Sequence, residues 1–310
     1  MNRLQANLCL ICVTLCWSTE VVIFACIPND VLPFATSFIT SAIAAVILGA
    51  CFFKRIKSQM KLDGKKILLR CLILGVLKAG YDILFLYGLK SFDVSTGAFT
   101  FSITVVVLPV ILLTMRKSVD KKTWISVVLV LCGIGIALGS SIVGTQFLGL
   151  MFMLLGCTIR AIFIVKLNDY AKQYDSITLS IWISIIGAII SFILWVIFQP
   201  ATFSAIPWSG TIIASLFIYA YFIVAFAQTL NIFAQRRATA AGATIIYSLE
   251  IVFSLIWSTI LPENLIDKVI PSPFHVIGAL FIVAGSLIEI IDFKSLRKVN
   301  SGNAEKQINS

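Results

Sequence analysis

Ten apolar segments, each long enough to cross a bilayer, run almost from one end of the chain to the other. A membrane span needs roughly 20 mainly apolar residues, because the hydrocarbon core is about 30 Å thick and a helix rises about 1.5 Å per residue. The predicted spans are 7–27, 32–53, 67–89, 94–115, 122–141, 147–166, 176–198, 208–233, 238–261 and 272–292. Segments of this length predict helices, since a helix satisfies its own backbone hydrogen bonds inside lipid.

The basic residues gather in alternate gaps between these segments. Of the 24 Lys and Arg, 19 lie in the N-terminal end, in the gaps after the second, fourth, sixth and eighth segments, and in the tail. The opposite gaps hold only Lys90 and Lys268. Because basic loops stay on the cytoplasmic side, this pattern predicts that both termini are cytoplasmic. We expect a multi-pass protein of a plasma membrane, specifically a bacterial inner membrane.

The composition excludes a soluble domain and argues against nucleic-acid binding. Hydrophobic residues make up 59% of the chain and charged residues 12%, whereas a soluble domain carries about 25% charged residues. The net charge of +10 is therefore a signal of topology, and we predict no nucleic-acid partner because no folded basic domain is present. The polar segment 294–310 is predicted to be a disordered cytoplasmic tail.

The eight cysteines lie within or at the edges of the predicted spans, which is not the pattern of a disulfide framework. Cys9, Cys12 and Cys16 share one helix face by their spacing. A metal relay would fit that spacing, but small apolar packing residues fit it better, and no histidine stands nearby. We predict no metal site.

Two pairs of short motifs suggest that the chain contains an internal repeat. Ser126 and Gly133 are small residues seven positions apart, as are Gly278 and Gly285, with matching apolar positions between them. A second resemblance links 95–98 with 240–243. Ten spans then divide into five plus five.

The repeats are assigned to residues 1–143 and 144–293. An odd number of spans in each half places the two copies in opposite orientations, as in many secondary transporters. The predicted fold class is an all-α integral membrane protein with ten transmembrane helices in two inverted five-helix repeats. The motif Gly135-x-x-x-Gly139 is predicted to provide a close helix-packing face.

Several ionisable side chains fall inside the predicted spans, where a charge costs about 2.5–3.5 kcal/mol on insertion scales. These residues are Glu20, Arg70, Lys78, Asp82, Arg160, Glu250 and Glu289. Arg70 and Glu289 lie within one turn of the cytoplasmic boundary, so we expect them to reach the interface by snorkelling. The other five require a cavity or a partner.

Lys78 and Asp82 are four residues apart and therefore share one face of the third span. They form either a neutral pair that holds the helix in register or a pair that lines a cavity. Tyr81 and Tyr87 on the same helix support the second interpretation.

The remaining charges allow more than one pairing. Glu20 follows Trp17 in the first span and is predicted to face a cavity. Arg160 is either a counter-ion for Glu20 or Glu250, or a contact for an anionic group of a substrate. Glu250 is either a functional carboxyl or a buried hydrogen-bonded one.

Two aromatic side chains complete the predicted site, since Trp17 and Tyr247 could either stack on a substrate or pack in the core. The full set of candidates for the substrate cavity or for coupling is Trp17, Glu20, Lys78, Tyr81, Asp82, Arg160, Tyr247 and Glu250.

The sequence lacks the motifs of the common enzyme classes. A phosphate-binding loop ending at Gly64-Lys65 would need Gly at position 59 and Ser or Thr at position 66, where Gln59 and Lys66 stand. The chain has no G-x-S-x-G, H-E-x-x-H or paired C-x-x-C motif. We therefore predict no enzymatic activity, no catalytic residue and no cofactor, with any energy for transport drawn from a gradient.

Three stretches resemble the EamA-type members of the drug/metabolite transporter superfamily. Cys16-Trp17-Ser18 resembles the start of the first helix, and 247–253 resembles the aromatic-x-Leu-Glu-Pro-Val-Phe stretch. Pro262-Glu263 with 277–285 resembles the end of the family pattern, so that the resemblance covers about 7–292.

This chain departs from the family pattern at two places. Ile251 replaces the usual Pro, and 115–117 lacks the Glu that the family carries after the fourth helix. The resemblance implies two inverted five-helix repeats around a central cavity, lined mainly by helices 1, 3, 4, 6, 8 and 9.

The predicted function is that of a secondary carrier, which exports a small polar metabolite such as an amino acid by alternating access around a midplane cavity. Both signs of charge among the candidates favour a zwitterionic solute over an apolar drug. The predicted partners are that solute and the lipid bilayer, and a homodimer is left open beside a monomer. The alternative is a non-transporting membrane sensor or assembly factor on the same scaffold. A membrane-embedded enzyme fits less well, because clustered carboxylates or histidines at an interface are missing.

Overall fold

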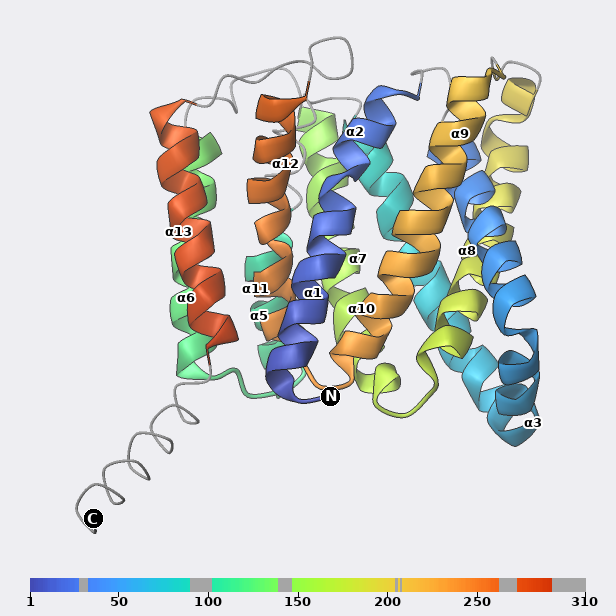
Figure 1. Cartoon of the computed structure of the whole chain (residues 1–310), viewed down its shortest axis with the longest axis horizontal. Helices are drawn as coiled ribbons and strands as arrows, with labels where there is room; N and C mark the ends of the chain where they lie inside the picture. Colours follow the sequence, from blue (N-terminus) through green and yellow to red (C-terminus); the bar gives the residue numbers. More distant parts are fainter. Residues whose placement is uncertain are drawn as a thin grey trace, which may run out of the picture.

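The computed structural model describes residues 1–27, 33–89, 102–138, 147–203, 206, 208–261 and 272–291, and over these ranges the secondary structure is helical. The predicted tail 294–310 lies outside the described residues, as do the motif at 95–98 and Pro262-Glu263. The helices stand side by side as roughly parallel rods (Figure 1).

Six of the described helical runs have the length and apolar character to cross a membrane. They are Pro33–Gly88 within α3 (Pro33–Leu89), α7 (Phe147–Ala171), α8 (Ser176–Phe198), Gly210–Gln235, Ala240–Trp257 and α13 (Pro273–Ile290). The shorter helices α1 (Arg3–Ser18) and α5 (Thr104–Thr114) are also apolar. Large apolar side chains such as Val46 and Leu148 are well exposed on the bundle's outside, where lipid covers them. The chain is a multi-pass membrane protein, and its number of crossings remains a prediction.

Helix α3 joins two predicted spans through an elbow at residues 52–63. Within α3 the backbone leaves helical geometry only at Phe52 and Asp63. The predicted polar gap 54–66 is therefore largely helical. The elbow lies at the same end of the bundle as the N-terminus (Figure 1). The connections at 115–120, 172–175 and 236–239 also lie there. We call this the basic end, because these segments carry most of the described Lys and Arg.

Two of the rods are interrupted in their middle by a Ser or Thr residue. At Thr19 the chain passes from α1 to α2 (Glu20–Ala25), and at Ser248 it passes from α11 (Ala240–Tyr247) to α12 (Leu249–Ile260). The Thr19 hydroxyl donates to the Cys16 carbonyl at 2.7 Å, and the Ser248 hydroxyl donates to the Ile245 carbonyl at 2.6 Å. Such side-chain bonds to the preceding turn compete with the helical ladder and bend helices.

A third rod changes its helix type. Helix α9 (Gly210–Ile218) continues into the π-helix η2 (Tyr219–Ala227), and α10 (Gln228–Gln235) follows. A π-helical stretch is rare and is frequently found at a functional site.

Helix α6 (Lys121–Leu138) and α13 pack against each other in opposite directions through the two predicted heptad motifs. Gly133 meets Gly278, and an added Cβ on either would lie 2.5–2.6 Å from the other's carbonyl oxygen. At the other end of the motifs, Gly285 meets the backbone of Ser126. The prediction for Gly135 was wrong, since a Cβ there would meet open space. Gly135 is two residues after Gly133 and therefore lies on a different side of α6.

Candidate functional site

The middle of the bundle holds a small cavity of about 50 Å³. This volume is large enough for a few water molecules, because one water needs about 10–15 Å³ on the same measure. The elements around it are α1, α2, α3, α7, η2, α10 and α12, including all three interrupted rods. Its lining residues are Trp17, Glu20, Lys78, Tyr81, Asp82, Phe85, Arg160, Tyr219, Ile223, Val224, Gln228 and Glu250.

Seven of the eight predicted site residues line this one cavity. The eighth, Tyr247, lies directly behind it, with its ring edge-on to that of Trp17 at a centroid distance of 5.0 Å. The five charged residues were chosen only because a charge inside a membrane span needs a partner or a cavity. The folded chain brings all five to one cavity, although they lie far apart in the sequence. Their part in transport remains a prediction.

Lys78 and Asp82 form an ion pair within α3, and the pair also faces the cavity. The Lys78 ammonium lies 5.6 Å from the centre of the Tyr81 ring, a favourable cation–π position. The two interpretations drawn from the spacing are therefore compatible, since the pair is neutralised and yet borders the cavity.

Arg160 of α7 has Glu250 as its carboxylate partner, with 3.7 Å between Nη2 and Oε2. Its guanidinium also lies 5.7 Å from the Trp17 ring centre and 6.0 Å from the Tyr247 ring centre. From the sequence, Glu20 or Glu250 was proposed as the counter-ion of Arg160, and the structure pairs Arg160 with Glu250. The separation is longer than that of a strong charge-assisted hydrogen bond, about 2.7–2.9 Å.

The Glu20 carboxylate is placed by the break at Thr19, which makes it the first residue of α2. It accepts a hydrogen bond of 2.8 Å from the hydroxyl of Tyr219, the first residue of the π-helix η2. Two interrupted rods thus meet at this bond. A buried carboxyl needs such donors, because burial away from water is costly without them.

Sequence reasoning missed Gln228, which lines the cavity and is 3% exposed. Within the described part of the chain, nothing lies in hydrogen-bond reach of its Nε2. Gln228 follows the last residue of the π-helix and lines the cavity. A search that counted only ionisable side chains could not find Gln228 or Tyr219. Gln228 could have been found as a polar amide side chain inside the predicted span 208–233.

The model of the EamA-like transporter family matches this chain twice, at residues 4–139 and 147–290. The chain belongs to the EamA-like transporter family. It is thus a membrane transporter of the drug/metabolite type. No curated protein matches it.

The fold of this EamA-like protein is shared with known structures, 28 chains of which match it. One is a crystal structure described only as that of a protein, which aligns with 92% of this chain and 96% of its own. The TM-score is 0.72 and the identity 16%, so this likeness concerns the fold alone.

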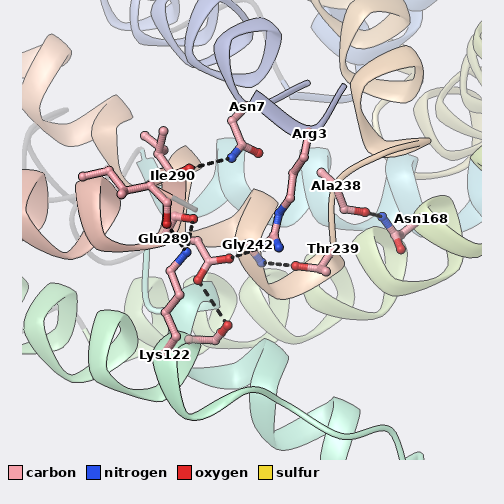
Figure 2. A network of polar contacts seen from close by, with 11 residues as sticks. Arg3, Asn7, Lys122, Asn168, Ala238, Thr239, Gly242, Glu289 and Ile290 are labelled. Carbon is pink, nitrogen blue, oxygen red and sulfur yellow. Dashed lines mark hydrogen bonds and ion pairs between the residues drawn. The ribbon is translucent and has the colours of Figure 1, made fainter. Parts of the chain in front are cut away.

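At the basic end of the EamA-like bundle, Glu289 does not reach the interface as predicted. Its side chain is 2% exposed, and it accepts from Arg3 at 3.3 Å and from Thr123 at 3.1 Å. Figure 2 shows it among α1, α6 and α11. Nearby, the Lys122 ammonium donates to the Glu289 and Ile291 carbonyls at 2.8 and 2.7 Å. Snorkelling was wrong here because α6, α11 and the N-terminus cover this last turn of α13.

Proposed function

We propose that this EamA-like protein is a secondary carrier that exports a small solute bearing both signs of charge, such as an amino acid. It works by alternating access of two inverted five-helix repeats around the central cavity. The observation that carries the proposal is the convergence of three carboxyls and two basic groups on one small cavity within an apolar bundle.

The pairing of those charges supports a zwitterionic solute. A buried charge is tolerated when a partner compensates it, and removing one partner is strongly unfavourable. An incoming ammonium group can replace Lys78 beside Asp82, while a carboxylate takes the place of Glu250 beside Arg160. The zwitterion adds no net charge, and the displaced Lys78 and Glu250 are opposite in sign and both line the cavity, whereas a neutral apolar drug would gain nothing from these groups.

Two observations support the inverted repeats and the orientation. The family model matches each half of the chain, and α6 and α13, which close the two halves, run antiparallel in contact. The basic end carries Arg3 and the elbow of α3. By the positive-inside rule this end faces the cytoplasm, and ten spans would return both termini to it.

Three single substitutions test the site. In vesicles loaded with a panel of labelled amino acids and related metabolites, Glu20→Gln, Lys78→Ala and Glu250→Gln should each lower the transport rate roughly 10–100-fold. This is the effect of losing a hydrogen bond to a charged group, about 1.5–3 kcal/mol. Lys65→Ala, exposed on α3 just after the elbow, is the matched control.

Wild-type rates in all three variants would remove the site assignment. Solute that raises the melting temperature of the purified protein without crossing the vesicle membrane would instead support the sensor alternative. Accumulation inside inverted vesicles, with the basic end outward, would establish the export direction.

Substitution of Gln228 separates a solute contact from a packing role. We expect Gln228→Leu to raise KM about tenfold, through loss of one hydrogen bond of about 1–1.5 kcal/mol to the solute. The melting temperature should stay level or rise, because the change removes a buried amide donor that has no partner in the described structure. Transport kinetics and thermal unfolding of the same preparation measure both.

The control is Ser184→Ala, which removes another buried polar group without a described partner, away from the cavity on α8. It should leave KM unchanged. A Gln228→Leu protein with unaltered KM and a lowered melting temperature would show that the amide serves packing only.

A further inference from the structure

A second and larger cavity, of about 290 Å³, opens at the basic end. It lies among the ends of α5, α6, α7 and α11. It shares none of its lining residues with the central cavity. These are Leu112, Lys117, Ser118, Val119, Asp120, Thr123, Val165, Asn168, Asp169, Lys172, Thr239, Ala240 and Ala241. Its size approaches that of pockets that bind small molecules, which begin at about 300 Å³.

This basic-end cavity again carries both signs of charge. The Lys117 ammonium lies 2.8 Å from each carboxylate oxygen of Asp169. The Lys172 ammonium donates to the side-chain Oδ1 of Asn168 at 2.9 Å. Lys117 and Asp169 are both partly exposed, at 39% and 36%, so water and solutes reach them. The charge pattern of the central cavity is thus repeated at the surface.

A chain of buried polar side chains connects the two cavities. Asn168 borders the basic-end cavity and donates to the carbonyls of Gln235 and Ala238 at 3.1 and 3.0 Å, the second bond being visible in Figure 2. The Gln235 amide donates to the Tyr247 hydroxyl at 2.9 Å, and that hydroxyl donates to Asn231. The Tyr247 ring then contacts Arg160 at the central cavity.

These connecting side chains are expensive to bury in an apolar bundle. Asn168, Asn231, Gln235 and Tyr247 are each at most 4% exposed. Gln235 Oε1 has no hydrogen-bond partner within the described residues, so the cluster is not fully satisfied. A partly satisfied buried network is less favourable than an apolar core, and packing alone does not explain it.

We propose that the two cavities are stations of one solute route, and that the cluster of Asn231, Gln235 and Tyr247 closes the route between them in this structure. The inference rests on the proposed function. The solute is the same amphoteric molecule, whose anionic group meets Lys117 or Lys172 and whose cationic group meets Asp169. Opening exposes the amides of Asn231 and Gln235 to the solute and to water, which then satisfy them.

Site-resolved thiol labelling tests this route without knowledge of the solute. Gln235→Cys and Asn231→Cys are made separately, and vesicles with the basic end outward are treated with a charged, membrane-impermeant methanethiosulfonate reagent. Mass spectrometry then gives the modification at each position, apart from the native cysteines. Ser184→Cys and Ser191→Cys, buried on α8, are the matched controls.

We expect positions 231 and 235 to react, and to react about tenfold faster when Tyr247→Phe also removes the hydroxyl that bonds the amide remaining in each variant. The controls should stay unmodified in both backgrounds. Labelling at 231 and 235 as slow as in the controls, with and without Tyr247→Phe, would overturn the inference. If the cysteine variants do not fold, hydrogen–deuterium exchange of the Tyr247→Phe protein tests the inference instead. Exchange should accelerate in α10 and α11 but not in α8. Exchange unchanged from the wild type would overturn the inference.

The outcome also separates this inference from the proposed function. Labelled positions in a protein that moves none of the panel would uphold the route and defeat the carrier assignment. Transport by a protein whose positions 231 and 235 stay sealed would uphold the carrier and defeat the route.

Discussion

Replacing Arg160 with methionine is expected to lower the free energy of unfolding by about 3–5 kcal/mol and to abolish transport. Glu250 would then keep a carboxylate that is only 17% exposed without its guanidinium partner, and an uncompensated buried charge costs about that much. Trp17 and Tyr247 would also lose their cation–π contacts with Arg160. Thermal and denaturant unfolding in lipid nanodiscs measures the loss, and vesicle transport measures the activity.

The double variant Arg160→Met with Glu250→Leu is the control for this prediction. Exchanging both members of a buried pair for apolar residues is often neutral or stabilising, so stability should return. Transport should not return, since the cavity has lost the groups that bind the solute. A double variant that transports at the wild-type rate would show that the pair is structural.

Gly133→Leu is expected to destabilise the protein by about 3 kcal/mol, the upper part of the usual range for overpacking. A Cβ at this position would stand 2.6 Å from the Gly278 carbonyl oxygen, so α6 and α13 would have to separate. Thermal unfolding and the yield of folded protein in the membrane check this result.

Gly135→Leu is the matched control, on the same helix and with nothing near its added Cβ. It introduces the same side chain and should leave the melting temperature close to that of the wild type. Equal effects of the two substitutions would contradict the assigned contact.

Hydropathy and charge predicted much of the fold because both follow directly from the bilayer. Each predicted apolar segment overlaps a described helix, the second and third sharing the long helix α3, and the basic gaps gather at one end of the bundle. The interruptions at Thr19 and Ser248 and the π-helix after Ile218 could not be predicted. No Pro or Gly marks these positions, and a hydroxyl bond to the preceding turn also occurs within unbroken helix, as at Thr14 in α1.

The site was predictable where membrane energetics applied and not elsewhere. A charge in oil requires shelter, which is why five positions scattered from Glu20 to Glu250 fall around one cavity. Neutral amides such as Gln228 give a weaker signal and were overlooked. Glu289 was placed wrongly because its partner Arg3 lies 286 residues away, and a local pattern does not reveal contacts between chain ends.

Helices α6 and α13 touch through their main chains, with no side chain between them at Gly133 and Gly278. Neither helix can turn about its axis without forcing atoms of the other aside. We therefore expect α6 and α13 to stay fixed relative to each other, while the helices that carry the ion pairs move relative to them. The contact is also formed by two similar heptads packed antiparallel, with Gly133 against Gly278 and Gly285 against Ser126. Two separate copies of an ancestral half, inserted facing opposite ways, would already have possessed it, and a later fusion would have needed no new surface.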